Sequence, residues 1–79
     1  MNESKKDLLR KVLIEGEINP LTYEKIKAEI FVECHLDKTQ SRDRALWSTW
    51  INGRSVPNRF CQDQINFVLT RNQIKPIYD

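Results

Sequence analysis

The chain has 79 residues, of which 39% are hydrophobic and 30% charged, and its formal net charge is +2. This balance is typical of one small folded domain and excludes an intrinsically disordered chain. Because its apolar runs are only a few residues long, the sequence predicts neither a membrane-spanning segment nor a secretory signal. We therefore expect a cytoplasmic protein that has no membrane partner and needs no cofactor.

Residues 4–15 are predicted to form the first helix, because four aliphatic residues between positions 8 and 13 recur at helical spacing. Ser4 followed by Asp7 resembles the start of a capping box, in which side chains bond the free N–H groups of the first turn. Gly16 is expected to end this helix.

Residues 20–36 are predicted to form a second helix, with Asn19 as its cap and Pro20 at its first position. One of its faces holds Tyr23, Ile26, Ile30, Phe31 and Cys34. A second apolar face, roughly opposite, holds Ala28, Val32 and Leu36. A helix with two apolar faces lies at the centre of its fold or joins two subunits, and in so small a domain we expect a homodimer.

A third helix is predicted over residues 42–52, with Ser41 as its cap, and Gly53 is expected to end it. Pro57 then opens a fourth helix, predicted over residues 57–71. No segment alternates with a period of two for long enough to form a sheet. The sequence therefore predicts a single all-α domain, a small bundle of four to five helices.

The third helix has two sides of different character. Its apolar side holds Leu46, Trp47, Trp50 and Ile51, and its other side is small and polar with arginines at the N-terminal end. Because aromatic residues at helical spacing usually pack into a core, we expect the two indoles to anchor the helix instead of stacking on a ligand. Short side chains and arginines on the outward side suit the major groove of DNA, although an ordinary solvated helix face has a similar composition.

The sequence from Trp50 to Pro57, followed by apolar residues at helical spacing, resembles the lambda-repressor-like helix-turn-helix family over residues 41–71. The resemblance implies a recognition helix with Trp47 and Trp50 in the core, followed by a turn in which Asn52, Gly53 and Arg54 lie beside phosphate. The preceding helix departs from the family pattern, because its connection to the recognition helix contains no glycine.

The first functional hypothesis is a small DNA-binding transcriptional regulator of phage or bacterial type. Charge agrees with it, since residues 1–38 sum to −1 and residues 39–79 to +3, with five arginines among the six basic residues of the second part. Its candidate DNA-contacting residues are Arg42, Arg44, Ala45, Ser48, Thr49, Asn52, Arg54 and Arg59.

The second hypothesis is a protein-binding regulatory module, such as an antirepressor that inactivates another transcription regulator. The second apolar face of the helix over 20–36 and the altered helix-turn-helix pattern motivate it. Aromatic residues dominate the energetics of many protein interfaces, so the candidate anchors are Trp47 or Trp50, Phe60 and Tyr78.

The sequence disfavours an enzyme and a metal site. Cys34 and His35 are adjacent on a helix and point about 100° apart, so they do not form a nucleophile–base pair. Cys34 and Cys61 lack the short spacing of a zinc site, and we expect both to be buried, reduced thiols. Glu29 and Glu33 fit a solvated helix face whose charge Lys25 partly offsets.

Overall fold

The computed structural model describes residues 5–79 of the protein. Within this range every regular element is helical, which confirms the predicted all-α class. A short 3-10 turn, Lys5–Asp7, leads into α1 (Leu8–Leu13), and α2 (Pro20–Glu33), α3 (Ser41–Ile51) and α4 (Arg59–Arg71) follow. No helix in this range is long and apolar enough to cross a lipid bilayer.

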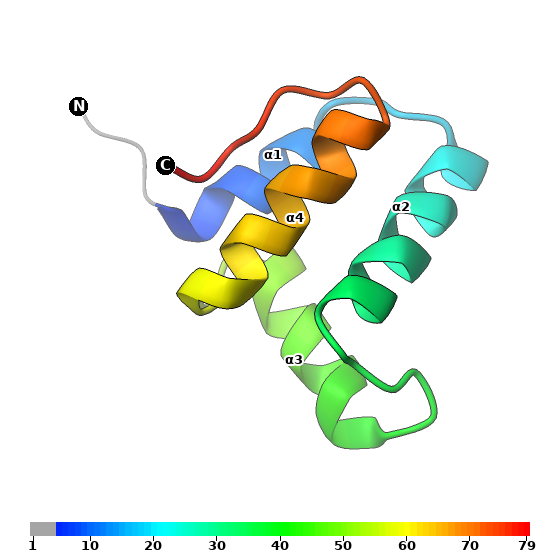
Figure 1. Cartoon of the computed structure of the whole chain (residues 1–79), viewed down its shortest axis with the longest axis vertical. Helices are drawn as coiled ribbons and strands as arrows, with labels where there is room; N and C mark the ends of the chain where they lie inside the picture. The colour runs from blue at the N-terminus through cyan, green and yellow to red at the C-terminus, as the bar shows by residue number, and fades with distance from the viewer. Residues whose placement is uncertain (1–4) are drawn as a thin grey trace.

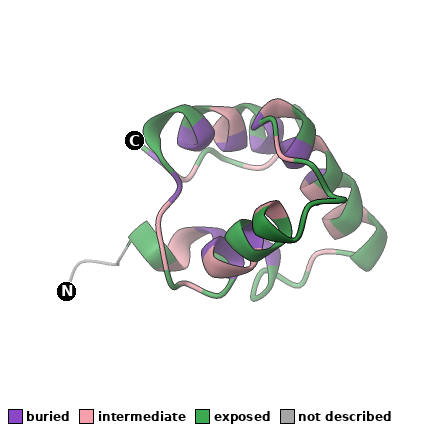
Figure 2. Ribbon diagram, turned by 90° about the horizontal axis from the view of Figure 1, so that it is seen from below, coloured by how far each residue is buried: buried purple, intermediate pink, exposed green. Residues whose placement is uncertain are grey.

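The four α-helices form two layers, α2 with α4 and α1 with α3 (Figures 1 and 2). The buried residues lie mainly on the sides that the layers turn toward each other (Figure 2). Six aliphatic side chains are almost completely buried and form the centre of the core: Leu9, Ile26, Ile30, Ile65, Val68 and Leu69. They come from α1, α2 and α4, so the core depends on contacts distant in sequence.

Helices α2 and α4 run antiparallel. Arg71 at the end of α4 bonds Glu29 on α2, whereas Cys61 in the first turn of α4 lies beside Cys34 at the end of α2. The segment after α4 folds back over that helix, because the Asn66 side chain accepts hydrogen bonds from the backbone N–H groups of Ile77 and Tyr78. Burial raises the pKa of the Tyr78 hydroxyl to about 12.

The starts of α2 and α3 differ in how they are capped. The Asn19 side chain caps α2 by accepting a hydrogen bond from the Leu21 N–H, as predicted. Ser41 was expected to cap α3, but it is the first helical residue, and Gln40 occupies the cap position without a side-chain bond. Ser4, expected to cap the first helix, lies outside the described residues, so its capping role stays a prediction.

The fourth helix begins at Arg59, two residues later than predicted from Pro57. Asn58 is the actual cap, because its side chain accepts a hydrogen bond from the Cys61 N–H. Pro57 precedes the cap and is buried, and its carbonyl accepts a hydrogen bond from the buried Gln62 side chain. Proline therefore shapes the entry to the helix instead of opening its first turn.

The first two helices end earlier than predicted, α1 at Leu13 and α2 at Glu33. Gly16 lies in the turn after α1, where an added Cβ would come within 2.4 Å of the Val12 carbonyl oxygen. At the end of α2 the chain reverses at His35, whose φ is +59°, and the Leu36 N–H bonds back to the Phe31 carbonyl. Because the left-handed residue is a histidine and not a glycine, the sequence gives no signal of this reversal.

Candidate nucleic-acid interface

The indole rings of α3 point into the core, as the sequence predicts. Trp47 and Trp50 are only 4% and 3% exposed, and their ring centroids are 6.4 Å apart in an edge-on arrangement. Phe31 of α2 packs against Trp47 with a centroid distance of 5.8 Å. These aromatic contacts fix the rotation of α3 about its axis and so decide which of its side chains face outward.

One residue assigned to the apolar side of α3 is misplaced. Leu46 was expected to be buried with the tryptophans, but it is 39% exposed. The buried side consists of Trp47, Trp50 and Ile51, which share one narrow stripe at spacings of three and four residues. Leu46, in the middle of α3, lies about 100° round the helix from Trp47 and so at the edge of that stripe.

The candidate contact residues on α3 are at the surface. Arg42, Arg44 and Ala45 are exposed, and Ser48 and Thr49 are half-buried. In Figure 2, which views the molecule from the end where α3 lies, much of this helix faces the viewer and is exposed. The structure therefore brings five of the eight predicted contact residues together on one outward side of one helix.

The turn after α3 is a Schellman motif built around Gly53. Gly53 has a φ of +74°, its N–H donates to the Trp50 carbonyl, and the Arg54 N–H donates to the Thr49 carbonyl at 2.8 Å. An added Cβ at Gly53 would lie 2.8 Å from Asp7 Oδ1, but a carboxylate can turn aside, so the positive φ is the main reason for glycine here. The motif places Asn52 and Arg54, both exposed, immediately beside the outward side of α3.

Hydroxyl groups tie the turn to the helix. Thr49 Oγ1 lies 2.7 Å from the Leu46 carbonyl and 2.8 Å from Ser55 Oγ. Since a hydroxyl has one proton, Thr49 donates to Leu46 and accepts from Ser55. Ser55 is a site residue that the sequence analysis missed, and nothing in the spacing marks it, because only the reversal at Gly53 brings it back to Thr49.

Ser48 and Asn52 form a second polar pair, in which Asn52 Nδ2 donates to Ser48 Oγ at 3.1 Å. Both side chains keep further bonding capacity, since a serine hydroxyl has its own proton and an amide has a second N–H and an oxygen. These two residues are therefore better suited to bind a partner than Thr49, whose proton already serves the turn.

The arginines differ in how firmly they are held. Arg44 Nη1 donates to the Lys38 carbonyl at 2.9 Å, and Arg42 lies 3.9 Å from Asp43 with 91% of its side chain exposed. Arg59 is bound by Asp63 at 3.2 Å and by the Asp79 carbonyl. Arg42, Arg44 and Arg54 thus form the cationic part of the site, whereas Arg59 already has two partners on and near α4.

The connection before α3 is held by an aspartate that the sequence analysis did not select. Asp43 Oδ2 accepts a hydrogen bond from the Asp37 N–H, and the Asp37 carboxylate in turn accepts bonds from Thr39. The Thr39 hydroxyl bond, followed by its backbone bond, lowers the pKa of Asp37. This network keeps the backbone of Lys38 where Arg44 can reach it.

The cysteines and the histidine do not meet at one site. Cys34 and Cys61 are free and buried, as predicted, and the Cys34 thiol lies 3.9 Å from the Cys61 carbonyl. Burial, followed by the proximity of Cys61, raises the pKa of the Cys34 thiol. His35 turns to the surface and stacks on Phe60, with nearly parallel rings whose centroids are 5.8 Å apart.

Of the aromatic anchors considered for a protein partner, only Phe60 is available. Trp47, Trp50 and Tyr78 are each at most 5% exposed, so they cannot enter a partner's pocket without unfolding the core. Phe60 is 49% exposed, and Phe67, one of its neighbours on α4, is 53% exposed. Phe67 was missed although it follows Phe60 by seven residues, a spacing that places both on one helix side.

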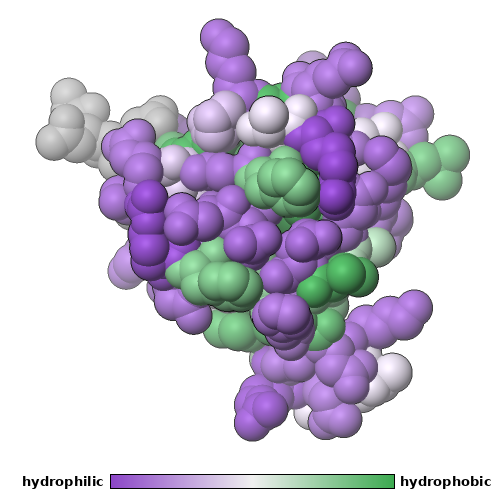
Figure 3. Space-filling model, in the orientation of Figure 1, coloured by the Kyte–Doolittle hydropathy of each residue, from purple (hydrophilic) through white to green (hydrophobic). Residues whose placement is uncertain are grey.

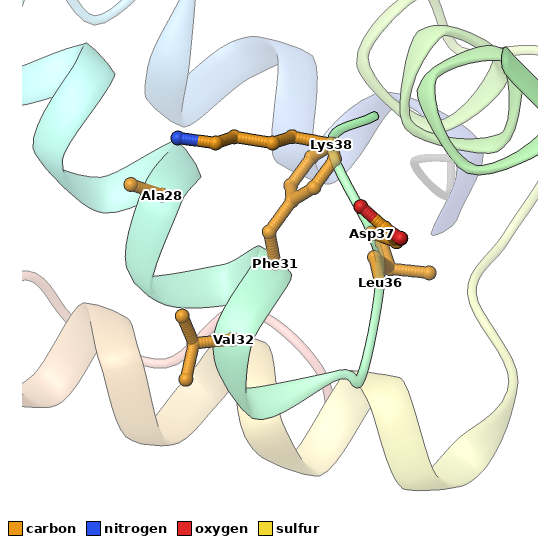
Figure 4. Close-up of a pocket in the computed structure, with 6 residues that line it drawn as sticks. All are labelled: Ala28, Phe31, Val32, Leu36, Asp37 and Lys38. Atoms are coloured by element: carbon orange, nitrogen blue, oxygen red, sulfur yellow. The ribbon is translucent and has the colours of Figure 1, made fainter. Parts of the chain in front are cut away.

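The second apolar face of α2 lines a groove of about 350 Å³. Ala28, Phe31, Val32 and Leu36 line it, and the Lys38 side chain extends past Phe31 toward Ala28 (Figure 4). The predicted second face is therefore real, but the α2–α3 connection covers part of it. Only Val32, at 69% exposure, presents a large apolar side chain from this face to solvent.

No protein-family model, curated protein or solved structure matches this chain. The site is accordingly characterised by its own geometry. That geometry is a rigidly anchored helix whose exposed side combines small side chains with arginines, followed by a glycine turn that carries another arginine.

Proposed function

We propose that the protein binds double-stranded DNA, as a small transcription regulator, with the outward side of α3 in the major groove. The observation that carries the proposal is the burial of Trp47 and Trp50, because it fixes α3 so that its arginines and small residues point outward. B-DNA admits an α-helix in its major groove when the side chains facing the bases are short enough for close approach.

Within this interface the residues have separate roles. Arg42 and Arg44 bond guanine edges or phosphates, and Ala45 and Ser48 allow the helix backbone to approach the bases. Asn52 and Arg54 contact the phosphate backbone from the turn. Thr49 positions this turn through Ser55. Arg59 is expected to contribute less than these arginines, because its guanidinium already bonds Asp63 and the Asp79 carbonyl.

Titration of labelled duplex DNA at several salt concentrations tests the proposal. Arg54→Ala is expected to weaken binding to all sequences alike and to reduce the slope of log K against log [salt] by about one, since one phosphate contact is lost. Lys75→Ala is the matched control. It removes one exposed positive charge from the segment after α4, which lies at the other end of the molecule from α3 (Figure 1).

If the Lys75→Ala control reduces binding and its salt slope as much as Arg54→Ala does, the attraction to DNA is general and the assigned interface is wrong. If the unaltered protein shows no salt-dependent retention of DNA, the proposed function itself is wrong.

A protein-binding regulatory module is the second candidate function, and the exposure of Phe60 and Phe67 on α4 favours it. Under this alternative another transcription regulator is bound by α4 and the protein has no DNA affinity. Recovery of one stoichiometric protein partner, whose binding is lost in Phe60→Ala while DNA is never retained, would select this function over the first.

A further inference from the structure

The outer surface of the α2–α4 layer carries large apolar side chains that remain about half exposed or more. Val32 is 69% exposed, Phe60 49% and Phe67 53%. In the space-filling view, several hydrophobic patches lie over this layer, with hydrophilic side chains around and between them (Figure 3). Single exposed apolar residues are common on proteins, whereas several on one face mark an interaction surface.

Three side-chain contacts and the helical spacing of α2 connect these residues across the layer. Phe67 lies under Arg71, whose guanidinium is 5.0 Å from the ring centroid, and Arg71 bonds Glu29 on α2. Val32 is three residues beyond Glu29 on the same side of α2, and His35, a further three residues on, stacks on Phe60. We call this surface, made of Glu29, Val32, His35, Phe60, Phe67 and Arg71, the α2–α4 outer face.

We propose that the α2–α4 outer face binds the same face of a second copy of this chain. Most charges on and beside it are paired within one chain, since Glu29 pairs with Lys25 at 3.5 Å and with Arg71 at 3.0 Å, and Arg59 pairs with Asp63. The small positive charge that remains opposes the approach of two identical faces only weakly, and a two-fold axis lets each apolar side chain meet its equivalents.

The α2–α4 layer is also broad enough to hold a standard interface. The molecule measures 37 × 24 × 20 Å, and the α2–α4 layer forms one of its two broad sides (Figure 1). The rectangle that bounds this side measures roughly 900 Å², which sets the upper limit of the contact, and a standard interface needs about 800 Å² from each partner. Two half-exposed phenylalanines and a valine among paired charges supply the apolar part of such a contact.

Sedimentation of the full chain without DNA, at concentrations from about 1 to 100 µM, tests the dimer. The unaltered protein is expected to sediment as a dimer, and Phe67→Glu to weaken association at least tenfold, because the change places a carboxylate within the interface. The introduced carboxylate would sit four residues before Arg71, a spacing that favours the helix, so the far-ultraviolet circular dichroism should stay unchanged. Phe60→Glu provides a second, independent variant.

Ile14→Glu is the matched control, since Ile14 is 52% exposed but belongs to the end of α1 in the other layer. This variant is expected to remain dimeric. A monomeric unaltered protein, a dimer that withstands both phenylalanine changes, or a dimer broken by Ile14→Glu alone would overturn the assignment of this face.

The proposed dimer and the proposed DNA binding can be refuted independently of each other. A dimer sensitive to Phe67→Glu but without DNA retention would leave this inference intact and refute the proposed function. A monomeric protein whose DNA binding depends on Arg54 would refute the inference and leave the proposed function intact. A monomer that forms a stable complex with a different protein through Phe60 would refute the inference and support the alternative function.

Discussion

A single carboxylate, Glu29, joins the two helices that frame the outer face. It accepts hydrogen bonds from Asn72 and Arg71, both at 3.0 Å, and pairs with Lys25 on its own helix. The Asn72 bond is the main cause that lowers the pKa of Glu29. Burial, the next largest effect, opposes it, and Arg71 and Lys25 lower the pKa further. From the sequence, Glu29 looked like part of a solvated face, because its partners on α4 are more than forty residues away.

The lowered pKa of Glu29 predicts a dependence of stability on pH. A carboxyl group whose pKa is lower in the folded state than its ordinary value of 4.5 stabilises the fold above that value. This stabilisation is lost as the pH falls through the folded-state pKa. The thermal midpoint of the unaltered protein should therefore drop more steeply between about pH 5 and pH 3 than that of Glu29→Gln. Parallel curves for the two proteins would show that the ionised Glu29 does not stabilise the fold.

Among the helices, α3 is stabilised by the packing of its buried side chains more than by an N-cap. Its cap residue Gln40 makes no side-chain bond, and its first turn lies at the surface. Isolated helices of this length are marginal in water, so contacts with the rest of the domain must stabilise it. The buried side that supplies them consists of Trp47, Trp50 and Ile51.

Substitutions on the two sides of α3 should have very different effects on stability. Trp47→Ala is expected to lower the free energy of unfolding by about 3–5 kcal/mol, because it removes a buried aromatic side chain and leaves a cavity. Leu46→Ala, at a position that is 39% exposed, should cost less than about 1 kcal/mol. Urea unfolding measures both. Trp47→Phe serves as a milder variant if the alanine form does not fold, and equal losses for Leu46→Ala and Trp47→Phe would contradict the inward orientation of the indole.

For the whole molecule, the proposed dimer and the proposed DNA interface together define how the two α3 helices are arranged. In a dimer formed through the α2–α4 outer face, the two α1–α3 layers lie on the outside. Three successive helix-to-helix separations of about 8–10 Å then place the two α3 helices on the order of 30 Å apart. When the two-fold axis follows the long axis of the molecule, both copies of α3 lie at the same end (Figure 1).

This separation is close to one turn of B-DNA, about 34 Å, so the dimer should select two inverted half-sites whose centres are about 10 base pairs apart. Selection from a randomised duplex pool with the unaltered protein tests this spacing. Phe67→Glu, selected in parallel, should recover single half-sites with lower affinity. Recovery of paired sites by both proteins, or of half-sites two or more turns apart, would contradict the dimer geometry.

Local patterns in the sequence were sufficient for the helices, the inward tryptophans and the turn at Gly53. Each depends on residues within one or two helical turns, where the spacing of apolar side chains and the conformational freedom of glycine decide the outcome. The exact ends of the helices were harder to predict from the sequence. The reversal at His35 uses a non-glycine residue in the left-handed region, and Asn58 replaces Pro57 as the start of α4 because its side chain reaches the Cys61 N–H.

The sequence by itself determined that this protein is a small helical bundle and which side of α3 is polar, because helical periodicity is a property of neighbouring residues. Only the tertiary structure decided that Ser55 supports Thr49, that Asp63 and Asp79 hold Arg59, and that Phe60 and Phe67 stay at the surface beside Val32. These outcomes follow from how the two layers pack. A helix with apolar residues on more than one side can bury only the side that its neighbours cover, and the chain reversals set which side that is.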